Sequence, residues 1–286
     1  MLRDISSYFV FRVVIFLGGL LPYKSRVFLC ARVVSALEPI LKIKERTIIN
    51  LNDIFPSILP EEKLAIARGV SRNIAHHLVD MVSRKDVLEN ISEKKLNGEG
   101  LCDLHNAIKN RQPIIFVSGH FGCYEALRLK LTNIAAPLGG LYKPFSNKFF
   151  NRFYVKTLAD AGWILFAKNK NGYREMINHL RSGGCVAILH DQHISNGVPI
   201  IFFGKTAQTG NSAAKLALKS NAILLPVYGV RKGVMDVDFI VEKPIAHTNI
   251  FQMTQDISQS LEGRVKKDMD QWIWNHRRWR KSSLSK

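Results

Sequence analysis

Beyond residue 97 the chain alternates short apolar runs with amphipathic segments, and this alternation limits the folds open to it. The apolar runs are rich in β-branched and aromatic residues, as buried strands are. Strands are predicted over 114–117, 138–142, 163–166, 185–189 and 223–227, and 236–241 alternates like an antiparallel member or an edge. Helices are predicted over 103–110, 124–132, 147–161, 173–181 and 212–220. Such alternation predicts an α/β fold with a mixed, mostly parallel sheet flanked by helices and right-handed crossovers.

The first 45 residues differ from this pattern, and we predict that 1–45 forms membrane-associated helices while 46–286 forms the α/β domain. The apolar run 13–21 follows Arg12 and ends at Pro22, so it is shorter than the roughly 20 apolar residues of a spanning helix. No cleavage site follows it, as a signal peptide would require. We interpret it as an inserted or tilted membrane anchor, with a buried core helix as the alternative.

Basic residues follow this run, and they suit an anionic lipid surface. The residues expected there are Lys24, Arg26 and Arg32, with the side chain of Arg12 reaching up to the headgroups. The stretch 27–44 stays amphipathic and basic, which predicts a second helix near the bilayer. Pro60 then opens a longer scaffold helix.

The charge of the whole chain points to an acidic partner. Its 286 residues carry a formal net charge of +18, which suits nucleic acid, anionic lipid or an acidic protein. No helix-turn-helix, zinc or RNA-recognition pattern is present, so nucleic acid is not an expected partner. Four cysteines without C-x-x-C pairing predict reduced thiols and a cytosolic compartment.

Residues 113–125, PIIFVSGHFGCYE, carry the most chemical information. The strand predicted before Ser118-Gly119 leaves His120 at its carboxyl end, where open α/β sheets place reacting groups. Glu125 follows after a turn, and a carboxylate that accepts a hydrogen bond from one imidazole nitrogen leaves the other nitrogen free to take a proton. The stretch therefore predicts a base for a hydroxyl nucleophile, although the spacing H-x4-E alone also fits a hydrogen-bonded surface histidine.

Two other chemistries are open at this level. Cys123 lies within the same stretch and is a possible thiol nucleophile, although no further feature singles it out. His190 and His193 flank an acid and are a possible metal site, but the second ligand pair of a structural zinc site is absent from the sequence. We therefore expect no metal.

With these motifs placed, the chain resembles the lipid A biosynthesis acyltransferases, the late lauroyl and myristoyl transferases of Gram-negative bacteria, within the wider lysophospholipid and glycerol-phosphate acyltransferase superfamily. The blocks that carry the resemblance are SGHFGCYE, LYKPFSN, LHDQ with GVPIIFFGKTAQT, and QWIWNHRRWR, in that order. With the N-terminal anchor they cover nearly the whole chain. The resemblance implies that His120 is the general base and that Glu125 orients it.

The resemblance also implies a set of substrate-binding residues. They are Tyr142, Lys143, Asn147, Asp191, Gln192, Phe203 and Gly204. Lys143 replaces an arginine of the family pattern, so a point charge stands where a planar, bidentate group is usual. Physically, a glycine beside two aromatic rings suits the wall of an acyl slot, and core packing explains the same rings. Asp191, like His120, comes shortly after the end of a predicted strand. This predicts that both residues lie at one edge of the sheet.

The implied reaction moves a fatty acyl chain from a thioester, on acyl carrier protein, to a hydroxyl of an anionic glycolipid, a lipid A precursor. It needs no cofactor, and it implies the cytoplasmic face of the bacterial inner membrane. The basic segment 264–286, with Trp272, Trp274 and Trp279, is predicted to lie at a headgroup interface. The alternatives are an acyl-CoA-dependent enzyme acting on a phospholipid or another glycolipid, and a non-catalytic basic membrane-surface protein.

Overall fold

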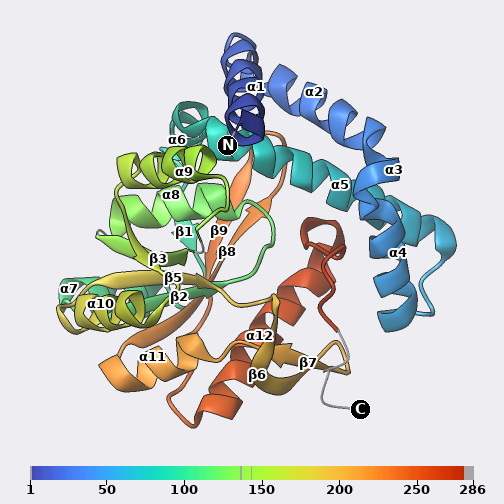
Figure 1. Cartoon of the computed structure of the whole chain (residues 1–286). Coiled ribbons are helices and arrows are strands. Elements are labelled where there is room, and N and C mark those ends of the chain that lie inside the picture. Colours follow the sequence, from blue (N-terminus) through green and yellow to red (C-terminus); the bar gives the residue numbers. More distant parts are fainter. Residues whose placement is uncertain (1, 136, 143, 280–286) are drawn as a thin grey trace.

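The computed structural model describes residues 2–135, 137–142 and 144–279, and within them a seven-stranded sheet forms the centre of the molecule (Figure 1). Its strand order is β1-β9-β8-β2-β5-β3-β4. The strands are β1 (Leu96–Asn97), β2 (Ile114–Ser118), β3 (Leu138–Tyr142), β4 (Trp163–Ala167), β5 (Cys185–Leu189), β8 (Ile223–Arg231) and β9 (Val237–Val241). Neighbouring strands are parallel except β8 and β9. The predicted mixed, mostly parallel sheet is confirmed: β9 pairs antiparallel with β8, and the short β1 beside it runs in the same direction as β9.

Helices flank the sheet, as predicted (Figure 1). The helices of this part are α6 (Arg84–Ile91), α7 (Leu101–Lys109), α8 (Tyr124–Ile134), α9 (Lys148–Asp160), α10 (Lys170–Arg181), α11 (Ser212–Ser220) and α12 (Ile250–Lys267). Alternate side chains of β2 enter different cores: Phe116 packs with residues of α8, and Val117 packs with residues of α10, α11 and α12. Because β2 is buried on both faces, its sequence reads as a continuous apolar run.

The N-terminal part consists of five helices in the portion that the structure describes from residue 2 to residue 82. They are α1 (Leu2–Gly19), α2 (Tyr23–Ala36), α3 (Glu38–Leu41), α4 (Ile43–Ile54) and α5 (Pro60–Val82). The helix predicted from Pro60 is confirmed. The stretch 27–44 is not one helix, because α2 ends at Ala36 and Lys42 has a positive φ of 52°.

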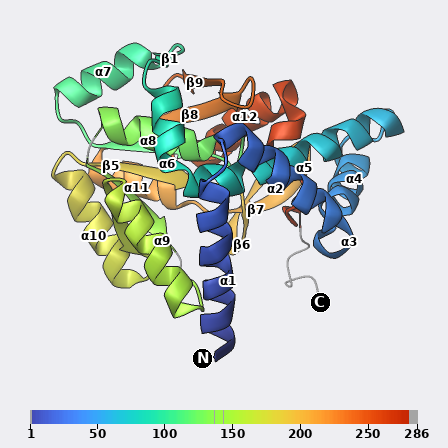
Figure 2. The same ribbon diagram turned by 90° about the horizontal axis from the view of Figure 1, so that it is seen from above.

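Helix α1 lies beside α9, while α2 lies along α5 (Figure 2). Aromatic contacts tie α1 to α9: the ring centroids of Phe11 and Phe150 are 4.9 Å apart, and those of Phe11 and Phe153 are 5.4 Å apart. Arg12 stacks over the ring of Phe153. Within residues 2–135, 137–142 and 144–279, no helix is both long and apolar enough to cross a bilayer.

A hairpin of β6 (His193–Phe202) and β7 (Lys205–Thr209) leaves the main sheet and covers α12 (Figure 1). The C-terminal aromatic residues fill the space beside it, and this overturns their predicted place at a headgroup interface. Trp272 and Trp274 are 1% and 0% exposed. Arg278 is also buried, and it donates to the carbonyl of Gln208 and the hydroxyl of Thr209. These side chains form a core that joins the hairpin to the N-terminal helices.

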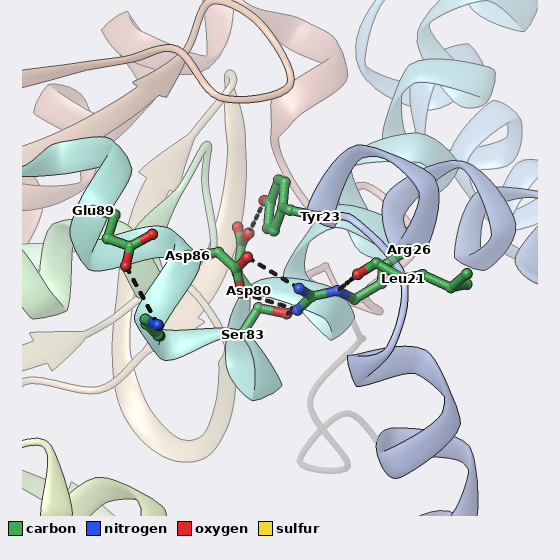
Figure 3. A network of polar contacts seen from close by, with 8 residues as sticks. Leu21, Tyr23, Arg26, Asp80, Ser83, Asp86 and Glu89 are labelled. Carbon is green, nitrogen blue, oxygen red and sulfur yellow. Dashed lines mark hydrogen bonds and ion pairs between the residues drawn. The ribbon is translucent and has the colours of Figure 1, made fainter.

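A buried ion pair fixes the N-terminal helices to the sheet. Asp80 of α5 accepts hydrogen bonds from the hydroxyl of Tyr23 on α2 and from Nη2 of Arg231 on β8, the latter at 2.9 Å. Arg26 lies close by and donates to Asp86 and to the hydroxyl of Ser83 (Figure 3). The prediction that Arg26 lies at a lipid surface is therefore wrong, because its guanidinium is bound to a carboxylate of the protein.

Replacing Asp80 by Asn is expected to destabilise the fold strongly. The substitution keeps the shape of the side chain but leaves the charge of Arg231 buried without a counter-charge, which typically costs about 3–5 kcal/mol. Glu89→Gln is the matched control, because the Lys85–Glu89 pair is exposed and such pairs contribute about 0–1 kcal/mol. Urea unfolding monitored by circular dichroism measures both. A loss below about 1 kcal/mol in Asp80→Asn would contradict the structural role of the ion pair.

Candidate active site

The pairing of β2 with β5 brings His120 and Asp191 together. The two strands are parallel and adjacent, and Ser118 is the register partner of Leu189. His120 and Asp191 each lie two residues beyond that pair, so both sit at the carboxyl edge of the sheet. The predicted common edge for these two residues is confirmed.

The two side chains make a close, well-oriented contact. Nδ1 of His120 lies 2.7 Å from Oδ1 of Asp191, and the backbone N–H of His120 donates to Oδ2 of the same carboxylate at 2.8 Å. Trp272 also donates its indole N–H to Oδ2, at 2.8 Å. Since an ionised carboxylate only accepts, Nδ1 of His120 carries the proton and Nε2 holds the free lone pair. The amide nitrogen of Gln192 lies 3.4 Å from that Nε2.

The charges around His120 favour its protonated form. Burial of the imidazole lowers its pKa, but the negative charge of Asp191, the hydrogen bond to it and the charge of Glu125 outweigh burial, so the His120 pKa lies above its ordinary value. For Asp191, burial raises the pKa, while the contacts with His120 and Trp272 lower it well below its usual range. Asp191 therefore stays ionised, and His120 is a stronger base than a free imidazole.

Next to this pair lies a cavity of about 540 Å³. It is bounded by the ends of the central strands and by α8 and α9, and His120, Glu125, Tyr142 and Gln192 line it. The remaining wall is mostly apolar and includes Phe116, Leu127, Leu131, Leu141, Phe145, Leu158, Trp163, Leu165, Ile188 and Leu189. A base in the wall of a mostly apolar cavity is suited to a reaction on one end of a long hydrocarbon chain.

Glu125 does not hold His120 as predicted. Its carboxylate accepts hydrogen bonds from Arg128, from Nε at 2.9 Å and from Nη2 at 2.8 Å, one turn further along α8. The acid that binds Nδ1 of His120 is Asp191. Glu125 lies in the first turn of the helix that follows His120, and the helical geometry of α8 directs it to Arg128 instead. It still lines the cavity and acts on His120 through its charge.

The residues predicted around Tyr142 have different places in the structure: one lines the cavity, and another caps a helix. Tyr142 ends β3 and lines the cavity. Lys143 lies outside the residues that the structure describes. Asn147 caps α9, because its side-chain oxygen accepts from the backbone N–H groups of Phe149 and Phe150. Its amide donates to the carbonyl of Asp4 in α1. Asn147 thus positions α9 and α1, and it is not part of the cavity wall.

Phe203 and Gly204 form the turn between β6 and β7, and neither residue is part of the cavity wall. Both have a positive φ, 51° and 73°, which suits a two-residue hairpin turn. The ring of Phe203 packs against Phe55 and Trp274. The acyl slot expected between these aromatic rings is therefore misplaced: the rings build the core beside the hairpin.

The structure argues against Cys123 as a nucleophile and against His190 as a metal ligand. Burial raises the pKa of the Cys123 thiol to about 12, so the thiolate needed for attack is scarce near neutral pH. Nδ1 of His190 donates to the carbonyl of Ser118 at 3.0 Å, and burial lowers the His190 pKa to about 4. His190 is therefore a neutral residue that ties β2 to β5.

Trp272 was predicted to lie at a headgroup interface, but in the structure it belongs to the candidate active site. It is almost fully buried and binds Asp191 across 81 positions of the chain. Its tryptophan-rich block was visible in the sequence, but nothing in that block indicates an acid as its partner.

Comparison with known families decides the family of the chain. The sequence matches the family of bacterial lipid A biosynthesis acyltransferases over residues 1–281, nearly its full length. The chain belongs to this family. A search of curated proteins found no match. This acyltransferase is thus an O-acyltransferase of lipid A biosynthesis, and the resemblance seen in its sequence blocks is confirmed.

Proposed function

We propose that this acyltransferase moves a fatty acyl chain from a thioester on acyl carrier protein to a hydroxyl of a lipid A precursor, with His120 as the general base. The observation that supports this best is the His120–Asp191 contact of 2.7 Å beside a mostly apolar cavity that His120 lines, in a member of this family. In this proposal Asp191, and not Glu125, orients the base.

His120 takes one proton from the acceptor hydroxyl and gives it to the leaving group. Nε2 of His120 takes the proton of the acceptor hydroxyl as the oxygen attacks the thioester carbonyl, and Asp191 stabilises the imidazolium that forms. The tetrahedral intermediate then collapses, the carbon–sulfur bond breaks, and the thiolate leaves with the proton from His120. An ester and a free thiol are the products. A positioned histidine contributes about 10²–10⁴-fold to such a reaction.

The apolar lining of the cavity suits the acyl chain, and its polar lining residues suit the acceptor. The apolar wall built by β2, β3, β4, α8 and α9 receives the hydrocarbon, which places the thioester carbonyl beside His120. Tyr142 and Gln192 are the described residues that we assign to contacts with the acceptor, and Lys143 is assigned to its anionic group. Glu125 and Arg128 form a paired, nearly neutral unit in the same wall.

The surface of the molecule suits an acidic donor and a membrane. A net charge of +18 attracts both an acidic carrier protein and anionic lipid. Helices α1 and α2 and the turn between them expose a series of large apolar side chains, namely Phe9, Val14, Phe16, Leu17, Leu20, Phe28 and Leu29. We propose that this apolar series rests in the cytoplasmic face of the inner membrane, with residues 1–45 as the membrane-associated part.

An assay with defined substrates tests this function. The purified full chain is offered lauroyl or myristoyl groups on acyl carrier protein or on coenzyme A, and either an incompletely acylated lipid A precursor or a lysophospholipid as acceptor. We expect acylated lipid A precursor, detected by mass spectrometry, from the carrier-protein donor. Efficient transfer from acyl-CoA to the lysophospholipid instead would assign the chain to another substrate class.

A further inference from the structure

Ser118 is a buried polar residue that the proposed mechanism does not use. It ends β2, two residues before His120, and only 5% of it is exposed. Its Oγ is buried and has no hydrogen-bond partner in the part of the chain that the structure describes. Buried hydroxyl groups are almost always hydrogen-bonded, because an unpaired one costs folding free energy. An unpaired hydroxyl beside a catalytic base therefore calls for a ligand.

The backbone around Ser118 is held in place. Its carbonyl accepts from the backbone N–H of His190 at 3.1 Å and from Nδ1 of the same residue at 3.0 Å. Ser258 lies 3.4 Å from the other ring nitrogen of His190. These contacts fix the backbone of Ser118, so its Cα–Cβ bond keeps the same direction relative to the sheet.

The side chain of Ser118 lines the cavity. Alternate residues of a strand face the same side, so Ser118 shares its face with Phe116, which also lines the cavity. Leu189, the register partner of Ser118, does so as well. Ser118 is thus part of the same cavity wall as His120, whose imidazole would take the acceptor's proton.

The chemistry of the reaction supplies the missing partner. The carbonyl oxygen of a thioester accepts hydrogen bonds, and it gains negative charge as the tetrahedral intermediate forms. Nε2 of neutral His120 is an acceptor, so it cannot stabilise that oxygen. A buried hydroxyl is a donor in a site of low dielectric, where such a hydrogen bond is strong. Resting on the function proposed above, we propose that Ser118 Oγ donates a hydrogen bond to the thioester carbonyl oxygen and to the oxyanion formed from it.

The geometry argues against Ser118 as a nucleophile. A serine that attacks a carbonyl needs a base within hydrogen-bond reach to take its proton. Ser118 Oγ makes no hydrogen bond with His120, since that atom has no hydrogen-bond partner among the residues described. An acyl-serine intermediate is therefore an outcome that the test must detect.

Ser118→Ala tests the proposal, with Ser71→Ala as the matched control. Ser71 is also a buried serine, 6% exposed, but its hydroxyl donates to the carbonyl of Ala67 within α5. We expect kcat of Ser118→Ala to fall by about 10²–10³-fold, the usual effect of losing one oxyanion donor, and kcat of Ser71→Ala to stay within twofold. Ser118→Thr, which keeps the hydroxyl, is expected to recover most of the rate.

Thermal unfolding gives a readout separate from activity. Removing an unpaired buried hydroxyl is expected to leave the midpoint of Ser118→Ala unchanged or raised, whereas Ser71→Ala loses a hydrogen bond and unfolds at a lower temperature. A fall in Ser118→Ala equal to that of Ser71→Ala would show that the hydroxyl has a structural partner, and the proposal would fail.

Two further results separate this proposal from the proposed function. If the wild-type chain transfers acyl groups and Ser118→Ala is as active as Ser71→Ala, the function stands and the role of Ser118 is overturned. An acyl group on Ser118, found by mass spectrometry after acid quenching, would overturn the donor role in favour of a nucleophile. If the wild-type chain transfers no acyl group from any thioester offered, the proposed function itself fails.

Discussion

Replacing His120 by Ala is expected to lower acyl transfer by about 10²–10⁴-fold, because the acceptor hydroxyl then loses the group that takes its proton. The loss should appear in kcat, since the imidazole acts at the reacting atoms and the apolar wall of the cavity is unchanged. Initial rates with saturating acyl donor, measured by mass spectrometry of the product lipid, give the size of the effect.

His105→Ala is the matched control for this substitution. His105 is an exposed histidine on α7, so its loss removes an imidazole without touching the cavity. Its activity is expected to equal that of the wild-type chain. Both variants should unfold with similar midpoints, which excludes a loss of fold as the cause. Transfer by a folded His120→Ala variant at a rate within tenfold of the wild type would remove His120 from the mechanism.

The position of His120 could be predicted from sequence because its signals are local. The run before it is continuous and apolar, since β2 is covered on both faces, and the glycine after Ser118 ends the run. The alternation of such runs with helices also predicts the class of sheet. A buried strand or a helix can be predicted from the residues of its own segment, without knowing which other segment packs against it.

The order of the strands could not be predicted in the same way. Parallel strands pair through crossovers, and no local feature of β2 says that β5 is its neighbour. That pairing is what places Asp191 at His120, across 71 positions of the chain. Glu125 is only five positions away, so spacing favoured it. On a helix, however, a side chain meets those three or four positions along, and Arg128 is one of these.

The prediction drawn from the composition of the C-terminal block was also wrong. Tryptophan and arginine together are typical of a headgroup interface, but the same residues serve a core when each polar group finds a partner. Trp272 donates to Asp191, Trp274 donates to the carbonyl of Met269, and Arg278 donates to the hairpin. The β6–β7 hairpin that this core supports was not predicted as strands. Its contacts with residues 272–279 are long-range, and no local signal reports them.

Asp191→Asn is expected to reduce the maximal rate about as much as the loss of His120, by about 10²–10⁴-fold. Asparagine keeps the size of the side chain but offers an amide that can donate to Nδ1. That contact favours the tautomer with the proton on Nε2, and the lone pair then faces away from the acceptor hydroxyl. The indole N–H of Trp272 and the backbone N–H of His120 hold the new side chain in the same place.

The pH profile of Asp191→Asn gives a second readout that a merely structural role would not move. The base must be neutral, so activity rises with pH through the His120 pKa, which in the wild-type chain lies above its ordinary value because of Asp191. Without that charge, burial lowers the pKa, and the acid limb of kcat/KM is expected to move to lower pH. Glu125→Gln is the comparison: its charge acts on His120 more weakly, so its limb should move less. A larger shift in Glu125→Gln than in Asp191→Asn would return the orienting role to Glu125.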